Sequence, residues 1–249
     1  MSSLKVCLIG YGRLGSAIGR GLKGRAQVKV STLPPTDQWA REDGYEVVPI
    51  EDCASFGDLI IVAVEPSAMD VVLSKIKGVE KPVVSTAALY PLKKIKEYVK
   101  CAYRIMPSVT VEVRRSPIMV AERGGCADDK VEELLKILGK PIWSSEAVLD
   151  AALPVVGSGP AVHALYYLSL VEAMVYAGVP REIAEEAAKE SIIGTLEMLN
   201  KQDPLSLRAR VETPGGITVT ITTELESAGV FGKVSEVLGR KGRELKARR

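Results

Sequence analysis

The chain has 249 residues, 47% of them hydrophobic, which is enough to bury a large core in one domain or two. Its formal net charge of +2 is too small to indicate a polyanionic partner such as a nucleic acid. The four cysteines form no C-x-x-C pair and only His163 could join them, which argues against a metal site and against a disulfide framework. We expect Cys7 and Cys101, which lie in apolar runs, to be buried thiols.

The first half of the chain alternates short apolar runs with helical patterns. Residues 4–9 form an apolar run that ends in glycine, and residues 59–64 (LIIVAV) form the clearest buried strand. Further strands are expected at 27–31, 82–85, 102–105 and 117–121, and helices at 14–22, 67–77, 91–99 and 128–138. This alternation predicts an α/β fold, a Rossmann-type doubly wound parallel sheet, over residues 1–150.

From about Ala151 the strand signals stop, and helical stretches are expected at 160–176, 181–199, 215–227 and 230–246. The first of these is apolar on nearly every side, so it must be covered all round. Too few residues remain in the chain to cover this helix on all sides. We therefore expect a partner subunit to cover it. We therefore predict an all-helical dimerisation domain over residues 151–249, in which His163, Tyr166 and Tyr167 serve as packing or interface residues.

The location of the protein is predicted from segments that the sequence lacks. No signal peptide precedes the first expected strand, and no apolar run reaches the roughly 18 residues of a membrane span. We therefore expect a soluble, cytoplasmic protein without a membrane partner. The basic residues between Arg240 and Arg249 have no aromatic residues among them and are interpreted as a solvated tail, not a nucleic-acid site.

A G-x-G-x-x-G pattern, made by Gly10, Gly12 and Gly15, follows the first expected strand and opens the first expected helix. In a dinucleotide-binding turn the first glycine makes the turn, the second lets the backbone approach the pyrophosphate, and the third lets helix pack on strand. The helix N-terminus then attracts the phosphates. We predict a dinucleotide site here that includes Arg13 and Leu14. An ordinary glycine-rich turn is the alternative.

Cofactor preference is predicted from the end of the second strand, where an NAD-binding chain usually carries an acidic residue for the ribose 2′-hydroxyl. Here the strand ends in Ser31 and Thr32. Hydroxyl groups tolerate a 2′-phosphate that a carboxylate would repel, and Arg13 adds a cation. We therefore expect NADP, with NADPH preferred and NADH as the alternative. The alternative is that Ser31 and Thr32 only begin a turn.

Three other strands are expected to end in small or hydroxyl residues at the edge of the sheet where ligands bind. Ala63 and Val64 end the clearest buried strand and Pro66 follows it, and all three are predicted to contact the cofactor. Residues 85–88 and 104–108 follow two further strands. Together these segments predict a sheet edge lined by small and hydroxyl side chains, which suits the binding of a flat ring.

The segment Thr213-Pro214-Gly215-Gly216 is interpreted as the start of a helix, with Thr213 as N-cap and Pro214 in the first helical position. The amides of Gly215 and Gly216 would then be open, with the hydroxyls of Thr213 and Thr218 beside them. This combination is typical of a carboxylate receptor. A capped helix without any ligand is an equal alternative.

Five motifs occur in the order found in pyrroline-5-carboxylate reductases, and the chain resembles that family along nearly its whole length. They are the opening glycine motif, Ala63-Val64-Glu65-Pro66, Arg104-Ile105-Met106-Pro107, Gly157-Ser158-Gly159-Pro160-Ala161 and Thr213-Pro214-Gly215-Gly216-Ile217-Thr218. The resemblance implies a Rossmann domain followed by a helical domain that interlocks into homodimers, often within larger rings. It also implies NADPH- or NADH-dependent reduction of pyrroline-5-carboxylate to proline, the last step of proline biosynthesis.

The resemblance further implies residue roles. The residues that would hold the substrate carboxylate are Thr213, Gly215, Gly216 and Thr218. The Thr218 hydroxyl, or a water that it holds, would be the catalytic group near the ring nitrogen. The nicotinamide would lie against Ala87-Ala88 and Met106-Pro107. A protonated cyclic imine is already electrophilic, so hydride transfer to it needs positioning more than a strong acid or base.

The chain departs from the family's pattern at Glu65, Leu89, Ser108, Val156 and Ile217. Because Leu89, Ser108 and Ile217 lie near the expected nicotinamide and substrate, a reductase of another imine or keto compound is an alternative. A non-catalytic NADP-binding relative is another. A hydroxy-acid dehydrogenase would need a well-placed catalytic histidine or lysine, which the sequence does not offer. A deazaflavin-dependent reductase would share the same nucleotide fold.

Overall fold

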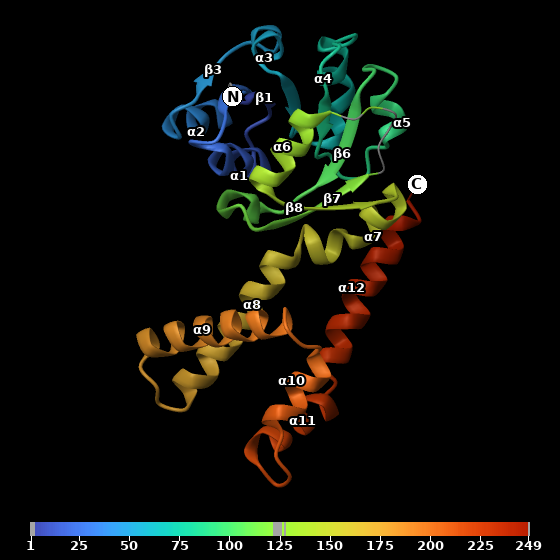
Figure 1. Ribbon diagram of the computed structural model, residues 1–249. Helices are drawn as coiled ribbons and strands as arrows, with labels where there is room; N and C mark the ends of the chain where they lie inside the picture. The colour runs from blue at the N-terminus through green and yellow to red at the C-terminus, as the bar shows by residue number, and fades with distance from the viewer. Residues whose placement is uncertain (1–2, 122–125, 127, 249) are drawn as a thin grey trace. The chain divides into compact units, whose positions relative to one another are not determined.

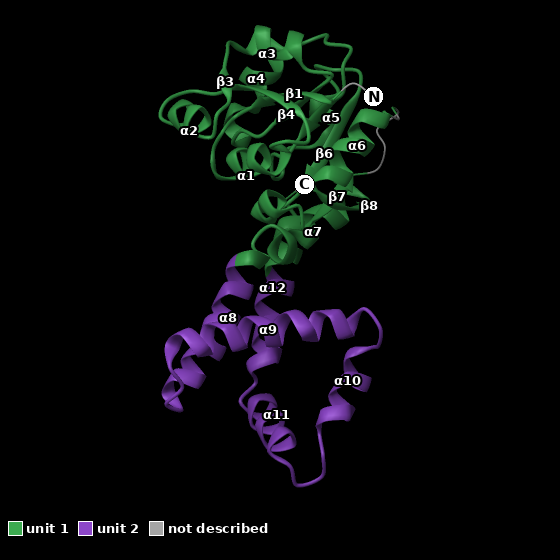
Figure 2. Ribbon diagram, turned by 60° about the vertical axis from the view of Figure 1, so that its left-hand side comes forward, with its two compact units in different colours: residues 1–160, 241–249 green, residues 161–240 purple. Residues whose placement is uncertain are grey.

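The computed structural model describes residues 3–121, 126 and 128–248 (Figure 1). The chain divides into two compact units, which are drawn in different colours in Figure 2. Unit 1 comprises residues 1–160 and 241–249, and unit 2 comprises residues 161–240. The division into domains at residues 150 and 151 stays a prediction.

Unit 1 is built on an eight-stranded sheet in the order β3-β2-β1-β4-β5-β6-β7-β8 (Figure 1). The strands are β1 (Lys5–Ile9), β2 (Gln27–Ser31), β3 (Glu46–Val47), β4 (Leu59–Val62), β5 (Val83–Ser85), β6 (Ala102–Met106), β7 (Ser116–Ala121) and β8 (Gly139–Ser144). β6 and β7 pair antiparallel, whereas the other described pairs are parallel. β1 lies between β2 and β4, so the strand order reverses there. The predicted doubly wound, mostly parallel sheet is confirmed.

Two buried clusters cover the two sides of this sheet because successive residues of a strand point to opposite faces. In β1, Val6 and Leu8 belong to one cluster, whereas Cys7 and Ile9 belong to the other. The first cluster includes residues of α1 (Arg13–Leu22) and α6 (Asp129–Leu138). The second includes residues of α3 (Ile50–Phe56), α4 (Met69–Lys75), α5 (Leu92–Ile95) and α7 (Glu146–Val156). Coverage on both faces explains why the central strands are continuously apolar.

The remaining helical segments of unit 1 are short: α2 (Thr36–Glu42) and the two 3₁₀ turns η1 (Pro66–Ala68) and η2 (Val109–Val113). Each of them connects a strand to the next element. The segments that follow β2 and β4 are the ones that matter for a ligand, since they leave the sheet at its carboxyl edge.

Unit 2 is helical in its described residues. Its elements are α8 (Gly159–Tyr176), α9 (Arg181–Leu199), α10 (Pro204–Val211), α11 (Ile217–Ser227) and α12 (Val230–Lys246), of which α8 and α12 extend into unit 1. Its buried core cluster consists of Val171, Ala184 and Ala188. Large apolar side chains such as Leu165, 68% exposed, and Leu196, 58% exposed, remain on its surface.

The helical run 146–176, which comprises α7 and α8, is long and apolar enough to cross a membrane by length and composition. The expectation that no apolar run reaches this length is therefore wrong. It failed because α7 and α8 follow one another with only residues 157 and 158 between them, so the run is longer than either helix.

The cysteines are the second correction. Cys7 in β1 is bonded to Cys53 in α3, and Cys101 is bonded to Cys126. The expectation of buried thiols and no disulfides is wrong, because partners 46 and 25 residues apart in sequence are brought together only by the fold. Their Cα atoms lie 5.1 and 5.6 Å apart, within the span of a disulfide. Closing loops of these lengths stabilises the fold by about 3–4 kcal/mol each in the chain-entropy view.

Candidate functional site

The glycine turn after β1 contains two glycines that the protein's own packing requires. Gly10 has φ +93°, and a Cβ on it would lie 2.4 Å from the carbonyl oxygen of Ala63. A Cβ on Gly15 would lie 2.2 Å from the carbonyl oxygen of Gly10. Both substitutions would force backbone apart, so these two glycines set the close approach of β1, α1 and the end of β4.

Gly12 is different, because the protein itself gives no reason for a glycine there. A Cβ on Gly12 would meet no described atom within 4 Å. Its backbone, with φ −70° and ψ −163°, is extended and open to any residue. The space beside Gly12 is therefore free for a ligand that approaches the backbone, as a pyrophosphate does in a dinucleotide site.

The N-terminus of α1 points its amides at the same turn. Gly12 is the N-cap residue, and no described side chain caps this helix by a hydrogen bond. The first turn, which begins with the exposed Arg13 and the half-buried Leu14, contains no acidic residue. Uncapped amides and the positive end of the helix dipole favour an anion at this position.

A cleft of about 620 Å³ opens beside this turn, at the carboxyl ends of β1 and β2 and next to the segment after β4. Its lining residues are Ile9, Gly10, Ser31, Thr32, Leu33, Asp37, Arg41, residues 47–51, Val64, Ala68, Val71, Val72 and Lys75. The walls are largely aliphatic, with a few hydroxyl and charged groups. This composition suits an adenosine whose ribose carries a polar group.

The structure brings four of the predicted cofactor residues into the cleft: Gly10, Ser31, Thr32 and Val64. The Thr32 hydroxyl accepts a hydrogen bond from the amide of Tyr11 at 3.2 Å and shares one with the Thr36 hydroxyl at 2.6 Å. Thr32 therefore also holds the glycine turn against the end of β2. This bond gives Thr32 a structural role in the turn, and a cofactor contact by Ser31 or Thr32 stays a prediction.

The other predicted cofactor residues do not line the cleft but lie on the same edge of the sheet. Ala63 and Pro66 follow β4, Ala87 follows β5, and Met106 and Pro107 lie at the end of β6. β4, β5 and β6 run parallel to β1 and β2, so their carboxyl ends share one edge. A cofactor contact by any of these residues stays a prediction.

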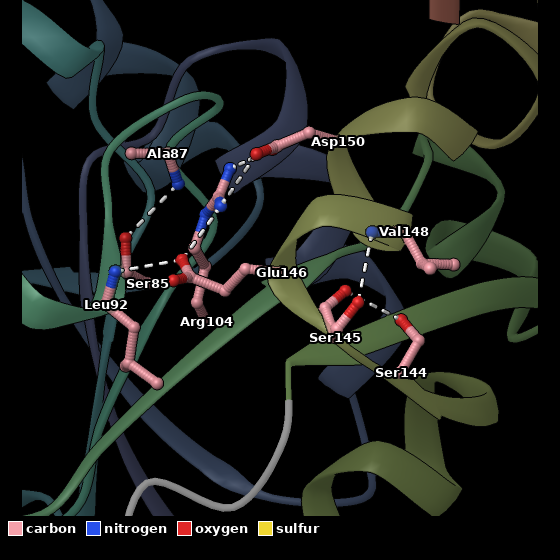
Figure 3. A network of polar contacts seen from close by, with 9 residues as sticks. All are labelled: Ser85, Ala87, Leu92, Arg104, Ser144, Ser145, Glu146, Val148 and Asp150. Atoms are coloured by element: carbon pink, nitrogen blue, oxygen red, sulfur yellow. Dashed lines mark hydrogen bonds and ion pairs between the residues drawn. The ribbon is translucent and has the colours of Figure 1, made fainter. Parts of the chain in front are cut away.

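A buried polar network at this edge joins β6 to α7 (Figure 3). Arg104 in β6 has a side chain only 1% exposed. Its Nη2 donates to Asp150 Oδ1 at 2.5 Å, and its Nη1 donates to Glu146 Oε1 at 2.9 Å. The same Glu146 oxygen accepts the amide of Leu92 at 2.9 Å. The network therefore fixes three elements together: β6, α7 and the start of α5.

From the sequence, Arg104 was recognised only as part of the Arg104-Ile105-Met106-Pro107 motif, and its partners were not predicted. The available signal was a charged residue in the middle of the apolar strand Ala102–Met106. A buried charge must be paired, which predicts acidic partners although not their positions. Glu146 and Asp150 share one face of α7 because they are four residues apart.

The predicted carboxylate receptor lies in unit 2, between α10 and α11. The structure corrects its local form: α11 begins at Ile217 with Gly216 as N-cap, so Thr213 is not the N-cap and Pro214 is not the first helical residue. Gly215 has φ +71°, and the Gly216 amide donates to the Thr213 carbonyl at 2.9 Å. Proline followed by a glycine at positive φ is the pattern of a type II turn, which competes with a helix start.

The corrected geometry retains the feature that an anion needs. Among the residues that the structure describes, no side chain caps the N-terminus of α11 by a hydrogen bond, and the first turn of this helix contains no acidic residue. A Cβ on Gly216 would lie 2.4 Å from the Thr213 hydroxyl, so this hydroxyl sits directly against the start of the helix. Thr218, the second residue of α11, is half-buried. The turn thus places Thr213, Gly215, Gly216 and Thr218 around one helix N-terminus.

An ion-pair network supports this turn from both sides. Arg208 in α10 contacts Glu212 Oε1 at 2.6 Å and also pairs with Glu226 of α11. The Thr222 hydroxyl donates to Glu212 Oε1 at 2.5 Å. This hydrogen bond and the Arg208 guanidinium hold the pKa of Glu212 below its usual range. Glu212 directly precedes the turn and shares the Arg208 guanidinium with Glu226.

Two protein families match parts of the chain. The family described as "Pyrroline-5-carboxylate reductase dimerisation" matches residues 146–244, and that described as "NADP oxidoreductase coenzyme F420-dependent" matches residues 5–89. The pyrroline-5-carboxylate reductase of Kluyveromyces lactis is 30% identical over 200 residues, which cover 74% of this chain and 70% of that protein. The enzyme of the same name from Aquifex aeolicus is 28% identical over 261 residues, which cover 98% and 97%.

Solved structures show the same fold. The pyrroline carboxylate reductase of Plasmodium falciparum with NADP bound superposes with a TM-score of 0.87 at 24% identity, covering 99% of this chain and 98% of that one. The 1-pyrroline-5-carboxylate reductase of Streptococcus pyogenes superposes with a TM-score of 0.85 at 24% identity, covering 98% of each chain.

Proposed function

The chain belongs to the pyrroline-5-carboxylate reductase family, and from that premise we propose that it reduces the cyclic imine pyrroline-5-carboxylate to proline with NADPH. The observation that carries this proposal is that the likeness spans both units, so the chain has the cofactor half and the substrate half of such an enzyme. The activity places the protein in proline biosynthesis.

The cofactor fits the residues at the edge of the sheet. The open space beside Gly12 and the uncapped start of α1 suit the pyrophosphate, with Arg13 as a nearby cation. Ser31 and Thr32, at the end of β2, suit a ribose with a 2′-phosphate, since neither residue carries a negative charge. When bound, NADPH supplies the hydride. The nicotinamide half then extends toward Ala87, Met106 and Pro107.

The turn between α10 and α11 suits the carboxylate of the substrate. The amide of Gly215 and the N-terminus of α11 attract the anion, while the Thr213 hydroxyl adds a hydrogen-bond donor. Arg208 offsets part of the negative charge of the neighbouring Glu212. The Thr218 hydroxyl, or a water that it holds, hydrogen-bonds the ring nitrogen. Positioning of this kind is sufficient because a protonated imine accepts a hydride without further activation.

We further propose that the helices of unit 2 form a homodimer. The exposed apolar side chains of α8 and α9, such as Leu165 and Leu196, need a cover, and the matched family is named for dimerisation. In this arrangement the exposed apolar residues of α8 face a partner subunit instead of lipid, and the protein works as a soluble enzyme of the cytoplasm. A larger ring would form by association of these homodimers with one another.

The proposal is tested by following NADPH and NADH oxidation with racemic pyrroline-5-carboxylate. We expect turnover with both nucleotides and a lower KM for NADPH. Turnover only with another cyclic imine or keto acid would assign a different substrate to the same fold. NADPH binding without turnover of any of these compounds would identify a non-catalytic relative.

Thr218→Ala is expected to lower kcat/KM for the imine by about 100-fold through loss of the hydrogen bond that positions the ring nitrogen, while the Kd of NADPH stays unchanged. Steady-state kinetics and a binding titration measure the two effects. Thr223→Ala, on the same helix but outside the proposed site, is the matched control and should behave like the wild type. A kcat/KM for Thr218→Ala close to that of the control would remove Thr218 from the site.

A further inference from the structure

Leu89 adopts a backbone conformation that leucine rarely takes. Its φ is +58°, in the left-handed region where Cβ crowds the following carbonyl group, so that glycine is usual there. Such residues persist where the surrounding structure fixes them, and they gather at functional sites. Leu89 lies in the connection between β5 and α5, at the carboxyl edge of the sheet.

The connection is held in place before Leu89 by hydrogen bonds that its backbone amides donate. The Thr86 amide donates to the carbonyl of Val62 in β4 at 3.0 Å. The Ala87 amide donates to the Ser85 hydroxyl at 3.2 Å, a bond visible in Figure 3. These contacts tie the first part of the connection to the ends of β4 and β5.

The connection is also held after Leu89. The Tyr90 hydroxyl donates to Asp70 Oδ1 in α4 at 2.5 Å. The Leu92 amide donates to Glu146, which Arg104 fixes against the sheet (Figure 3). Ala88 and Leu89 therefore form the apex of a segment fastened at both ends. This fastening explains how the left-handed conformation of Leu89 is maintained.

Core packing does not explain why the apex residue is a leucine. Ala87, Tyr90 and Leu92 belong to the buried cluster on one face of the sheet, with exposures of 4%, 5% and 8%. Leu89 is only half-buried, and it is not among the described side chains packed against that cluster. A residue whose backbone is strained and which the buried cluster does not hold is a candidate for contact with a ligand.

The topology indicates which ligand. The cleft lined by Ser31 and Thr32 belongs to the β1–β2 half of the sheet and suits the adenosine half of a dinucleotide. A dinucleotide crosses a doubly wound sheet at the point where the strand order reverses, here between β1 and β4. Its other half must then extend toward the ends of β4, β5 and β6, where Leu89 lies.

We propose that Leu89 is a cofactor-contact residue whose side chain packs against the nicotinamide half of NADPH. This inference rests on the proposed function in one respect, which is that the cofactor is NADPH. The contact buries the leucine and offsets the strain of its backbone. A glycine at the apex would relieve the strain but would leave that half of the cofactor without its apolar support.

The test is calorimetric titration of NADPH and of 2′-phospho-ADP-ribose, which lacks the nicotinamide, into the wild type and three variants. We expect Leu89→Gly and Leu89→Asn, which suit the left-handed conformation, to raise the Kd of NADPH about 10-fold through loss of the buried side chain. The Kd of 2′-phospho-ADP-ribose should not change. Leu89→Met keeps the apolar bulk and should bind NADPH like the wild type. The Tm of Leu89→Gly should be equal to or above that of the wild type.

Three results would overturn the inference. An unchanged Kd of NADPH for Leu89→Gly would show that the nicotinamide half does not touch this residue. An equal loss for both ligands, or a Tm several degrees lower, would show that Leu89 supports the fold of the segment instead. If the wild type itself binds no NADPH, the proposed function fails together with this inference, and the wild-type titration alone reveals that case.

Discussion

Gly12→Val is expected to abolish NADPH binding, with a Kd raised more than about 100-fold, while the protein keeps its fold. The backbone at Gly12 is extended, and a Cβ there meets no described protein atom, so the first side-chain atom adds no strain and no clash within the chain. The added side chain instead occupies the space that the pyrophosphate needs in order to reach the amides of α1. A binding titration and the Tm of the variant measure the two halves of this prediction.

Gly10→Ala is the informative contrast to this variant. Its Cβ would lie 2.4 Å from a carbonyl oxygen, and its φ of +93° disfavours any side chain, so the fold itself should be damaged. Gly12→Ala should fall between the wild type and Gly12→Val in its affinity for NADPH. Normal NADPH binding by Gly12→Val would mean that the cofactor does not approach this turn.

Arg104→Met is expected to lower the free energy of unfolding by about 3–5 kcal/mol. The arginine side chain is 1% exposed, and its principal partner Asp150 is 0% exposed, so the variant leaves a carboxylate in the interior without its cation. Glu146 loses the same partner and with it the support for the Leu92 amide. Denaturation by guanidinium chloride, followed by circular dichroism, gives the difference in unfolding free energy.

Two further variants separate the charge from the geometry of this network. Arg104→Lys keeps the charge but cannot contact both carboxylates through a planar fork, so it should recover only part of the loss. The double variant Arg104→Met with Asp150→Leu removes both charges of the closest pair and should be more stable than Arg104→Met alone. An unfolding free energy for Arg104→Met within about 1 kcal/mol of the wild type would contradict the importance of the buried pair.

The central part of the fold could be predicted from sequence because its strands are buried on both faces. β1 and β4 are uninterrupted apolar runs, and the structure places both in the middle of the sheet. The two edge strands were missed. β3 has only two residues, and β8 contains Pro141 and alternates partly buried with exposed residues. Edge strands pair on one side only and need no continuous apolar pattern.

In unit 2 the helices α8, α9, α11 and α12 were predicted, whereas α10 was not. The sequence of α10, PLSLRARV, has no buried residue and no distinct apolar face, so hydrophobic periodicity gave no signal for it. The start of α11 was placed too early for another reason. A proline before two glycines is compatible with a helix N-terminus and with a type II turn, and only the positive φ of Gly215 distinguishes them.

The features that sequence reasoning missed entirely depend on contacts between distant residues. Arg104 lies 42 residues from Glu146 and 46 from Asp150, and the disulfide partners are 25 and 46 residues apart. Spacing along the chain carries no information about such pairs. The glycine motif, by contrast, is local, and it predicted both the turn after β1 and the open position at Gly12.

The placement of the cross-links has a consequence for the behaviour of the enzyme on dilution. Both disulfides lie in unit 1, whereas unit 2, without a cysteine in its sequence, has a buried cluster of only three described residues. The fold of unit 1 is therefore stabilised by bonds within a single chain. Unit 2 depends on the proposed partner, and so by mass action on protein concentration. As the solution is diluted, catalytic turnover should disappear before affinity for the nucleotide does, leaving a monomer that still holds its cofactor.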